Sequence, residues 1–229
     1  MTNRLPVIAD IEGLGKIVET VADFYTELQQ LKEAGAILIS PRDEAYARLR
    51  TRGREDIGRS YGTRTSSGFE YARHQLPILR LESRLLAPEL AQSFVKANRE
   101  WKDFNTSSTR EYEKSLAQAQ ADLNKSPKER GVIVLPSINI FTISNKENWE
   151  IYEAIFKDQA EPYFELNGSI NVRPVNPIDV DSQDGTLLTQ MWFRDLDVRS
   201  ELIGGDRVLD LGNRLRGVLK SGEADALGK

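Results

Sequence analysis

The chain has 229 residues, of which 39% are hydrophobic and 29% charged, and its formal net charge is −4. This composition is typical of a folded protein with a hydrophobic core and excludes a largely disordered chain. Because the chain has no cysteine, disulfides, thiolate nucleophiles and thiolate metal sites are excluded. The chain has one histidine, His74, so a zinc site built on two or three histidines is excluded.

Hydropathy and charge also bear on location and partners. No run of about 18 apolar residues is present, so we expect no membrane-spanning helix. The N-terminus lacks the apolar core and cleavage site of a signal peptide, which predicts a location in the cytoplasm or in a particle assembled there. The negative net charge argues against indiscriminate nucleic-acid binding, although a local basic patch leaves nucleic acid open as a partner.

The first predicted element is an amphipathic helix that begins after Asp10 and ends at Gly35. Its apolar residues alternate three and four positions apart, as on one helix face: Ile11, Leu14, Val18, Val21, Tyr25 and Leu28. We expect this face to pack on the protein's own sheet, with an oligomer seam as the alternative. Residues 36–40 then predict a short buried strand.

Residues 41–68 are predicted to form a long arginine-rich loop that contains a short helix over 43–49. Strands are expected at 69–71 and 78–81, because apolar side chains there share one face.

Two amphipathic helices are predicted over residues 88–124. The first begins at Pro88, a residue suited to the first helical turn. Ser108 and Glu111 have the spacing of a capping box for the second. The inner faces are expected to carry Leu90, Phe94, Trp101, Tyr112, Leu116 and Leu123. We interpret this segment as an antiparallel helical hairpin inserted between strands.

The second half of the chain predicts more strands than helices. Strands are expected at 131–135, 138–143 and 187–193, with a helix carrying Trp149, Tyr152, Ile155 and Phe156 between them. Asn167-Gly168 predicts the type I′ turn of a β-hairpin over 163–172. Residues 207–219 favour a helix over a strand. The chain is therefore predicted to be a single α+β domain, 1–229, with packed helices on a mixed or mostly antiparallel sheet.

The most unusual feature is a cluster of arginines. Ten of the chain's 20 arginines fall between Arg42 and Arg84, a window with no lysine, and six acidic residues there leave a net charge of +4 (10 − 6). Arginine suits bidentate binding of carboxylates and phosphates and paired contacts at interfaces. The residues proposed to make interface or anion-binding contacts are Arg52, Arg54, Arg59, Tyr61 and Arg64. The alternative is a solvated loop with local salt bridges.

Three further features have a functional and a structural interpretation. Asp179 to Gly185 resembles a calcium loop in composition, but its spacing differs from the EF-hand pattern, so turn formation is favoured and no metal site is expected. His74 has the chemistry of a general base, yet a lone histidine is more often structural. The aromatic residues Trp101, Phe104, Trp149 and Trp192 are expected to pack in the core.

These observations favour a non-enzymatic structural or assembly subunit of a larger homo- or hetero-oligomeric particle, such as a virion component. No cofactor is expected, and the expected partners are copies of the chain or other assembly subunits. The alternatives are a nucleic-acid- or phosphate-binding protein that uses the arginine-rich segment, or a hydrolase dependent on a metal held by oxygen ligands.

Overall fold

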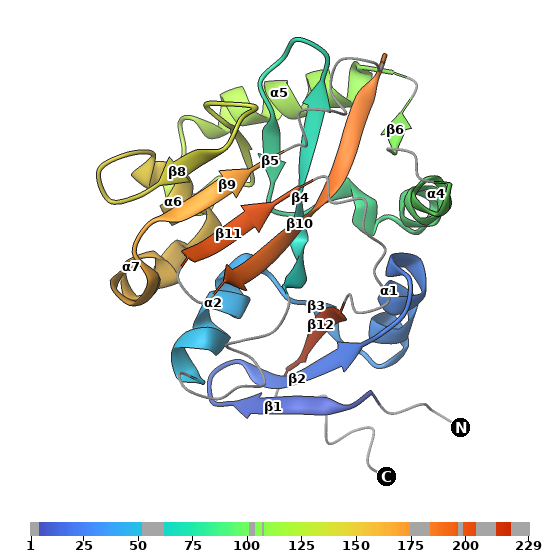
Figure 1. Cartoon of the computed structure of the whole chain (residues 1–229), viewed down its shortest axis with the longest axis vertical. Coiled ribbons are helices and arrows are strands. Elements are labelled where there is room, and N and C mark those ends of the chain that lie inside the picture. Colours follow the sequence, from blue (N-terminus) through green and yellow to red (C-terminus); the bar gives the residue numbers. More distant parts are fainter. Residues whose placement is uncertain are drawn as a thin grey trace.

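A mixed sheet of twelve strands organises the chain (Figure 1). The computed structural model describes residues 5–51, 62–100, 104–106, 108–174, 184–196, 199–204 and 214–220. Helices pack on this sheet, which confirms the mixed α+β class. Among the described residues, no helix has both the length and the apolar character needed to cross a membrane.

Eight strands form the main path of the sheet. In spatial order they are β1 (Val7–Ile11), β2 (Gly15–Thr20), β12 (Arg214–Leu219), β4 (Thr63–Ala72), β10 (Thr186–Leu196), β11 (Arg199–Ile203), β9 (Ile170–Arg173) and β8 (Phe141–Ile143). The β12–β4 and β11–β9 pairs are parallel, and the other pairs along this path are antiparallel. Strand β12 lies beside β2, so the last described strand pairs with the N-terminal β-hairpin.

Four short strands attach beside this path. Strand β3 (Ile37–Leu38) pairs with β12, and β6 (Asn105–Thr106) pairs with β10. Strand β5 (Ile78–Arg80) joins β4 to β7 (Val132–Val134). These pairings confirm the strands predicted at 36–40, 69–71, 78–81, 131–135, 138–143 and 187–193, with bounds that differ by a few residues.

The helices lie on both faces of the sheet. They are α1 (Phe24–Glu33), α2 (Pro41–Arg50), α4 (Pro88–Arg99), α5 (Arg110–Asp122), α6 (Trp149–Phe156) and α7 (Ala160–Asn167), with short 3₁₀ turns η1 (Arg84–Leu86), η2 (Pro127–Glu129) and η3 (Lys157–Gln159). Val18 packs in the core cluster of α1 and α4, whereas its neighbour Ile17 packs in that of α2. Since neighbouring strand residues point to opposite faces, α1 and α2 cover opposite faces of β2.

The helix predicted over 11–35 is wrong in its first half, where β1 and β2 form a hairpin instead. Gly13 and Gly15 have φ angles of 80° and 114°, which allow the chain to reverse between the strands. The helix starts only after Asp23, whose carboxylate accepts the Thr26 N–H at 3.1 Å. The apolar residues of 11–28 are three and four positions apart because the β1–β2 hairpin and helix α1 both place apolar side chains in the core.

The loop predicted over 41–68 is wrong at both of its ends. The short helix predicted within it is confirmed as α2, which is capped by the Ser40 hydroxyl accepting the Asp43 N–H at 3.1 Å. Strand β4 begins at Thr63, because its polar residues 63–68 pair with β10 ahead of the strand predicted from residue 69. Residues 52–61 lie outside the described part of the chain.

The helical hairpin predicted over 88–124 is not confirmed, although both helices form. Strand β6 lies between them and pairs with β10. Phe94 of α4 packs on Phe24 of α1 with ring centroids 5.6 Å apart, whereas Tyr112 of α5 packs with Ile78 of β5 in a different cluster. Leu123 is 64% exposed, and the predicted capping box is replaced by Thr109 as the residue before the helix.

Two predictions in the second half are also wrong. Residues 163–172 form the end of α7 and strand β9 rather than a hairpin, because Gly168, with φ 67°, ends a helix and its N–H donates to the Phe164 carbonyl at 2.7 Å. Residues 214–219 form strand β12 rather than a helix, with 207–213 outside the described residues. Leu215 and Arg216 point to opposite faces of the sheet, an alternation that the prediction did not recognise.

Candidate functional site

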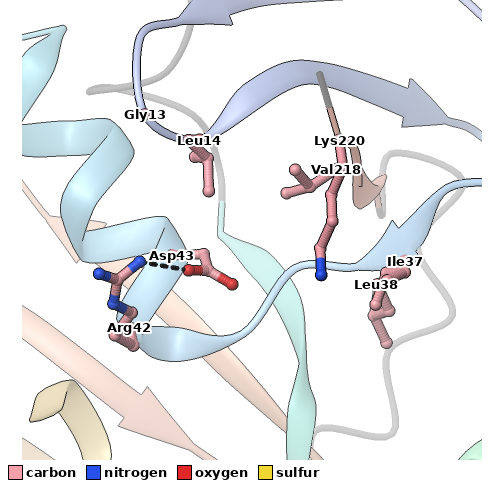
Figure 2. Close-up of a pocket in the computed structure, with 8 residues that line it drawn as sticks. All are labelled: Gly13, Leu14, Ile37, Leu38, Arg42, Asp43, Val218 and Lys220. Carbon is pink, nitrogen blue, oxygen red and sulfur yellow. Dashed lines mark hydrogen bonds and ion pairs between the residues drawn. The ribbon is translucent and has the colours of Figure 1, made fainter. Parts of the chain in front are cut away.

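A pocket of about 540 Å³ opens where the β1–β2 turn, β3, the first turn of α2 and the end of β12 meet (Figure 2). Its lining residues are Gly13, Leu14, Ile37, Leu38, Arg42, Asp43, Val218 and Lys220. Figure 2 shows Lys220 extending from β12 toward β3, with Arg42 and Asp43 on the side formed by α2. The pocket therefore combines an aliphatic lining with charged groups of both signs.

Close backbone packing fixes the walls of this pocket. The Tyr46 hydroxyl of α2 donates to the Glu12 carbonyl at 3.0 Å and so ties the β1–β2 turn to the helix. A Cβ at Gly15 would overlap the Leu219 carbonyl oxygen, so the turn and the end of β12 can approach only through a glycine.

The charged side chains at the pocket differ in whether they form ion pairs. Arg42 donates from Nε and Nη2 to the two carboxylate oxygens of Asp158 at 2.8 and 2.6 Å, and from Nη1 to Asp43 at 2.9 Å. These hydrogen bonds from Arg42 lower the pKa of Asp158 to about 2. The second oxygen of Asp43 accepts the Ser40 hydroxyl at 2.7 Å. Lys220, by contrast, has no ion pair with any residue of the described ranges.

A buried ion network continues from α2 into the sheet. Arg216 of β12 is fully buried, with Nη1 2.9 Å from Glu44 Oε1 and Nε 3.4 Å from Glu19 Oε1. Glu44 also accepts from Arg48 Nε at 3.0 Å. The Arg48 guanidinium lies over the Phe193 ring, 4.1 Å from its centroid. The network thus connects α2 to β2, β12 and β10.

The opposite face of the same strands holds a different buried charge. Glu27 of α1 is fully buried, and its Oε1 accepts the N–H groups of Ala22 at 3.1 Å and Leu215 at 3.4 Å. Burial raises the pKa of Glu27 to about 7, although these N–H donors and Arg64 act to lower it. The Glu27 carboxyl therefore titrates near neutral pH.

A third charge network attaches α5 to the sheet. Glu70 of β4 lies 2.8 Å from Arg84 Nε and 3.5 Å from Arg80 Nε. Its other oxygen accepts the Ser115 hydroxyl of α5 at 2.6 Å. Arg84 also forms an ion pair with Glu111 of α5. These contacts join β4, β5, η1 and α5 into one unit.

The structure places only one of the predicted interface residues. Arg52, Arg54, Arg59 and Tyr61 lie outside the described residues. Arg64 is 3% exposed, and its guanidinium packs over the rings of Phe24 and Trp192 at 5.4 and 4.9 Å from their centroids. Arg64 is therefore a core residue of the chain, which does not favour its predicted contact with a neighbouring molecule.

Much of the arginine enrichment has an internal explanation. The described arginines of the 42–84 window that form ion pairs with carboxylates of the chain itself include Arg42, Arg48, Arg73, Arg80 and Arg84. A guanidinium can bind two groups at once, which lysine does less well. At these positions the choice of arginine serves internal pairing.

The other candidate residues do not form a catalytic or metal-binding cluster within the described ranges. His74 is exposed in the turn after β4 and has a φ angle of 62°. Residues 179–183 lie outside the described residues, and Asp184 is fully exposed, 4.0 Å from Arg73. No group of three or more His, Cys, Asp or Glu side chains among the described residues could hold a metal.

The aromatic residues that are described pack as the sequence predicts. Trp192 is 7% exposed, and Phe104 packs edge-on against Phe94 with ring centroids 6.2 Å apart. Trp149 stacks on Tyr152 at 5.1 Å, while Trp101 lies outside the described residues.

The sequence interpretation missed the pocket residues and the partners of Arg216. Glu44 and Arg48 are four residues apart on a predicted helix, a spacing that indicates an ion pair. No comparable signal links Arg216 to Glu44, because 172 residues separate them in the chain.

Comparisons with known proteins bear on the fold alone. No protein-family model and no curated protein matches the chain. A solved structure from work on the accommodation of massive sequence variation in Nanoarchaeota by the C-type lectin fold is similar, with a TM-score of 0.54 and 17% identity. The match covers 96% of this chain and all of the other. The similarity therefore shows a C-type lectin fold, which does not by itself indicate a function.

Proposed function

We propose that this chain is a non-enzymatic subunit of a larger homo- or hetero-oligomeric assembly, such as a virion component. In this proposal a rigid sheet scaffold carries the arginine-rich segment, and Arg52, Arg54, Arg59 and Tyr61 contact neighbouring subunits. The observation that carries the proposal is the buried ion network around Arg216, which connects α2 to β2 and β12. Helix α2 ends just before residues 52–61, so the network fixes the helix that precedes that segment.

The residues that follow this segment are also closely packed. A Cβ at Gly62, which precedes β4, would lie 2.9 Å from Arg194 Cγ and 3.3 Å from the Trp192 ring. Thr63 then pairs with Phe193 of β10 and with Arg214 of β12. Three strands therefore meet where residues 52–61 rejoin the described chain, which supports a scaffold that presents this segment from a fixed base.

The fold is compatible with this use. The similar structure concerns a C-type lectin fold that accommodates massive sequence variation in Nanoarchaeota. For the present chain we propose a related separation of roles, in which the sheet and its buried charges are constrained and the surface segments determine the partner. The favoured partner groups are carboxylates, because the chain carries a net charge of −4 and further copies can supply them.

The test compares the native mass of the wild type with that of R52A/R54A/R59A across a salt series, by mass photometry. We expect the wild type to form a defined oligomer, alone or with its co-purifying subunits. The triple variant should associate more weakly, and salt should weaken wild-type association more than that of the variant, because opposite charges across the interface are screened. The matched control is R99A/R110A/R173A, which removes three exposed arginines elsewhere. The charge-preserving R52K/R54K/R59K separates the guanidinium geometry from charge alone.

Two outcomes would overturn the proposal. A wild type that is monomeric at all concentrations, with no co-purifying partner, would exclude an assembly subunit. Unchanged assembly of the alanine variant, together with loss of single- or double-stranded DNA binding, would favour the nucleic-acid alternative. In that case binding should fall steeply with salt, because phosphate contacts release counterions.

A further inference from the structure

We propose that the pocket at the end of β12 binds a small amphiphilic carboxylate. In this complex the carboxylate lies at Lys220, and the aliphatic body of the ligand covers Leu14, Ile37 and Val218. The proposal does not rest on the assembly role, since it is argued from described lining residues alone.

The sign of the ligand's charge follows from which charges are already engaged. Both oxygens of Asp43 accept hydrogen bonds, one from Arg42 and one from Ser40. Arg42 is shared between Asp43 and Asp158. Lys220 is exposed and pairs with no residue of the described ranges. The pocket therefore has one unengaged positive charge, which favours a monoanion over a cation.

The apolar part of the ligand follows from the pocket's lining. Ile37 is 58% exposed, although it lies beside Leu38 and Val218, which are 8% and 6% exposed. An isoleucine left in water beside buried aliphatic residues gains free energy when a ligand covers it. Figure 2 shows Val218 and Ile37 on either side of the Lys220 side chain, so one ligand can reach the aliphatic groups and the ammonium together.

Size and shape favour a small ligand with a flexible chain. The volume of about 540 Å³ lies within the range of small-molecule sites. None of the described residues that line the pocket is aromatic, and four of them are aliphatic, which favours an aliphatic body for the ligand. An eight-carbon carboxylate is therefore a suitable probe, and octanoate is the simplest.

The experiment titrates octanoate, octanol and octylamine into ¹⁵N-labelled full-length protein and follows amide shifts by NMR. We expect octanoate to shift the amides of Ile37 and Lys220 with a dissociation constant of about 1 mM. Octanol and octylamine should bind at least several-fold more weakly. K220M should weaken octanoate binding about fivefold, the effect of one partly exposed ionic contact. K32M removes an exposed lysine of α1 and should leave the affinity for octanoate unchanged.

Two further variants keep the proposal testable if K220M has an indirect effect. I37S should weaken the binding of both octanoate and octanol. K220E should invert the binding preference, so that octylamine binds more tightly than octanoate. Equal affinity for octanoate and octanol in the wild type would overturn the carboxylate assignment. Octanoate shifts confined to residues outside the pocket, or none at all, would overturn the site.

Discussion

The two faces of β2, β12 and β4 bury charge in different ways. On the α2 face, Arg216 contacts two carboxylates, and one of them, Glu44, also binds Arg48. On the α1 face, Glu27 accepts two backbone N–H groups and forms no ion pair among those of the described residues, while its Oε2, like Glu44 Oε2 on the other face, is buried without a hydrogen-bond partner among the described residues. Arg64, on this same face, packs over two aromatic rings.

This difference has a physical consequence. Removing a charge from water is costly unless a partner of opposite sign and several hydrogen bonds replace the water. The α2 face supplies partners of opposite sign for its buried charges. The α1 face supplies fewer, and burial shifts the pKa of Glu27 upward to about 7 instead. The stability contributed by the charges of the α2 face should therefore depend on the presence of each partner. The stability contributed by Glu27 on the α1 face should depend on pH.

The largest expected effect is that of R216M. The change leaves Glu44 and Glu19 buried beside an apolar side chain, and breaking a buried pair in this way costs about 3–5 kcal/mol. We expect the free energy of unfolding, measured in urea at pH 7, to fall by this amount. R173M makes the same substitution at an exposed arginine of β9 and should cost less than about 0.5 kcal/mol.

A second variant distinguishes lost pairing from lost packing. R216M/E19Q removes one of the two carboxylates that Arg216 contacts, leaves the Glu44–Arg48 pair intact, and should recover part of the stability. A double variant that is no more stable than R216M would show that the cost comes from packing, and that the contrast between the two faces is not one of charge.

The next effect concerns Glu27 and pH. Its pKa rises from an ordinary 4.5 to about 7 in the folded protein. The folded state therefore binds the proton more tightly than the unfolded state does, and the contribution to stability is full below pH 4.5. It is lost as the pH rises to about 7, with a total of about 3 kcal/mol. E27Q should abolish this part of the pH dependence, because glutamine keeps an oxygen that can accept the same two N–H groups.

The measurement is the difference in unfolding free energy between wild type and E27Q at pH 4, 5, 6, 7 and 8. Other titrating groups are common to both proteins and cancel. E33Q, on the exposed side of the same helix, is the matched control and should show no such trend in this range. A constant difference between wild type and E27Q would mean that Glu27 is as well compensated as the charges on the α2 face.

Local signals in the sequence predicted much of the secondary structure and little of its arrangement. Ser40-Pro41 marks the start of α2, and the apolar run 131–135 marks β7, because caps and short apolar runs act within a few residues. The turn at Gly13 and Gly15 was not predicted, and Asn167-Gly168 was predicted to form a hairpin turn although it ends helix α7. Both errors arise because a glycine with positive φ ends helices and connects strands equally well.

The candidate site was less accessible to sequence reasoning. The pocket joins residues 13–14, 37–43 and 218–220, which only the pairing of β12 with β2 and β3 brings together. Such pairing leaves no local trace in the sequence, and Lys220 directly follows residues 207–219, for which a helix was predicted. The arginine window was recognised correctly as unusual, but composition could not separate Arg48 or Arg84, which bind the chain's own carboxylates, from arginines that face outward.

The smallest expected effect is that of D158N, at the exposed pair with Arg42. The two hydrogen bonds between these side chains are short, yet the carboxylate is 59% exposed. An exposed pair contributes less than about 1 kcal/mol. The pKa of Asp158 is lowered to about 2 from 3.8, so the pair's contribution is present above pH 3.8 and is lost as the pH falls through 2. We therefore expect D158N to cost a few tenths of a kcal/mol at pH 7, and less in 1 M salt, where charges are screened within about 3 Å. D184N, at an exposed carboxylate 4.0 Å from Arg73, should cost less still. A loss for D158N that approached that of R216M and persisted in 1 M salt would show that a surface pair can match a buried network, and the distinction between buried and exposed charge in this protein would have to be abandoned.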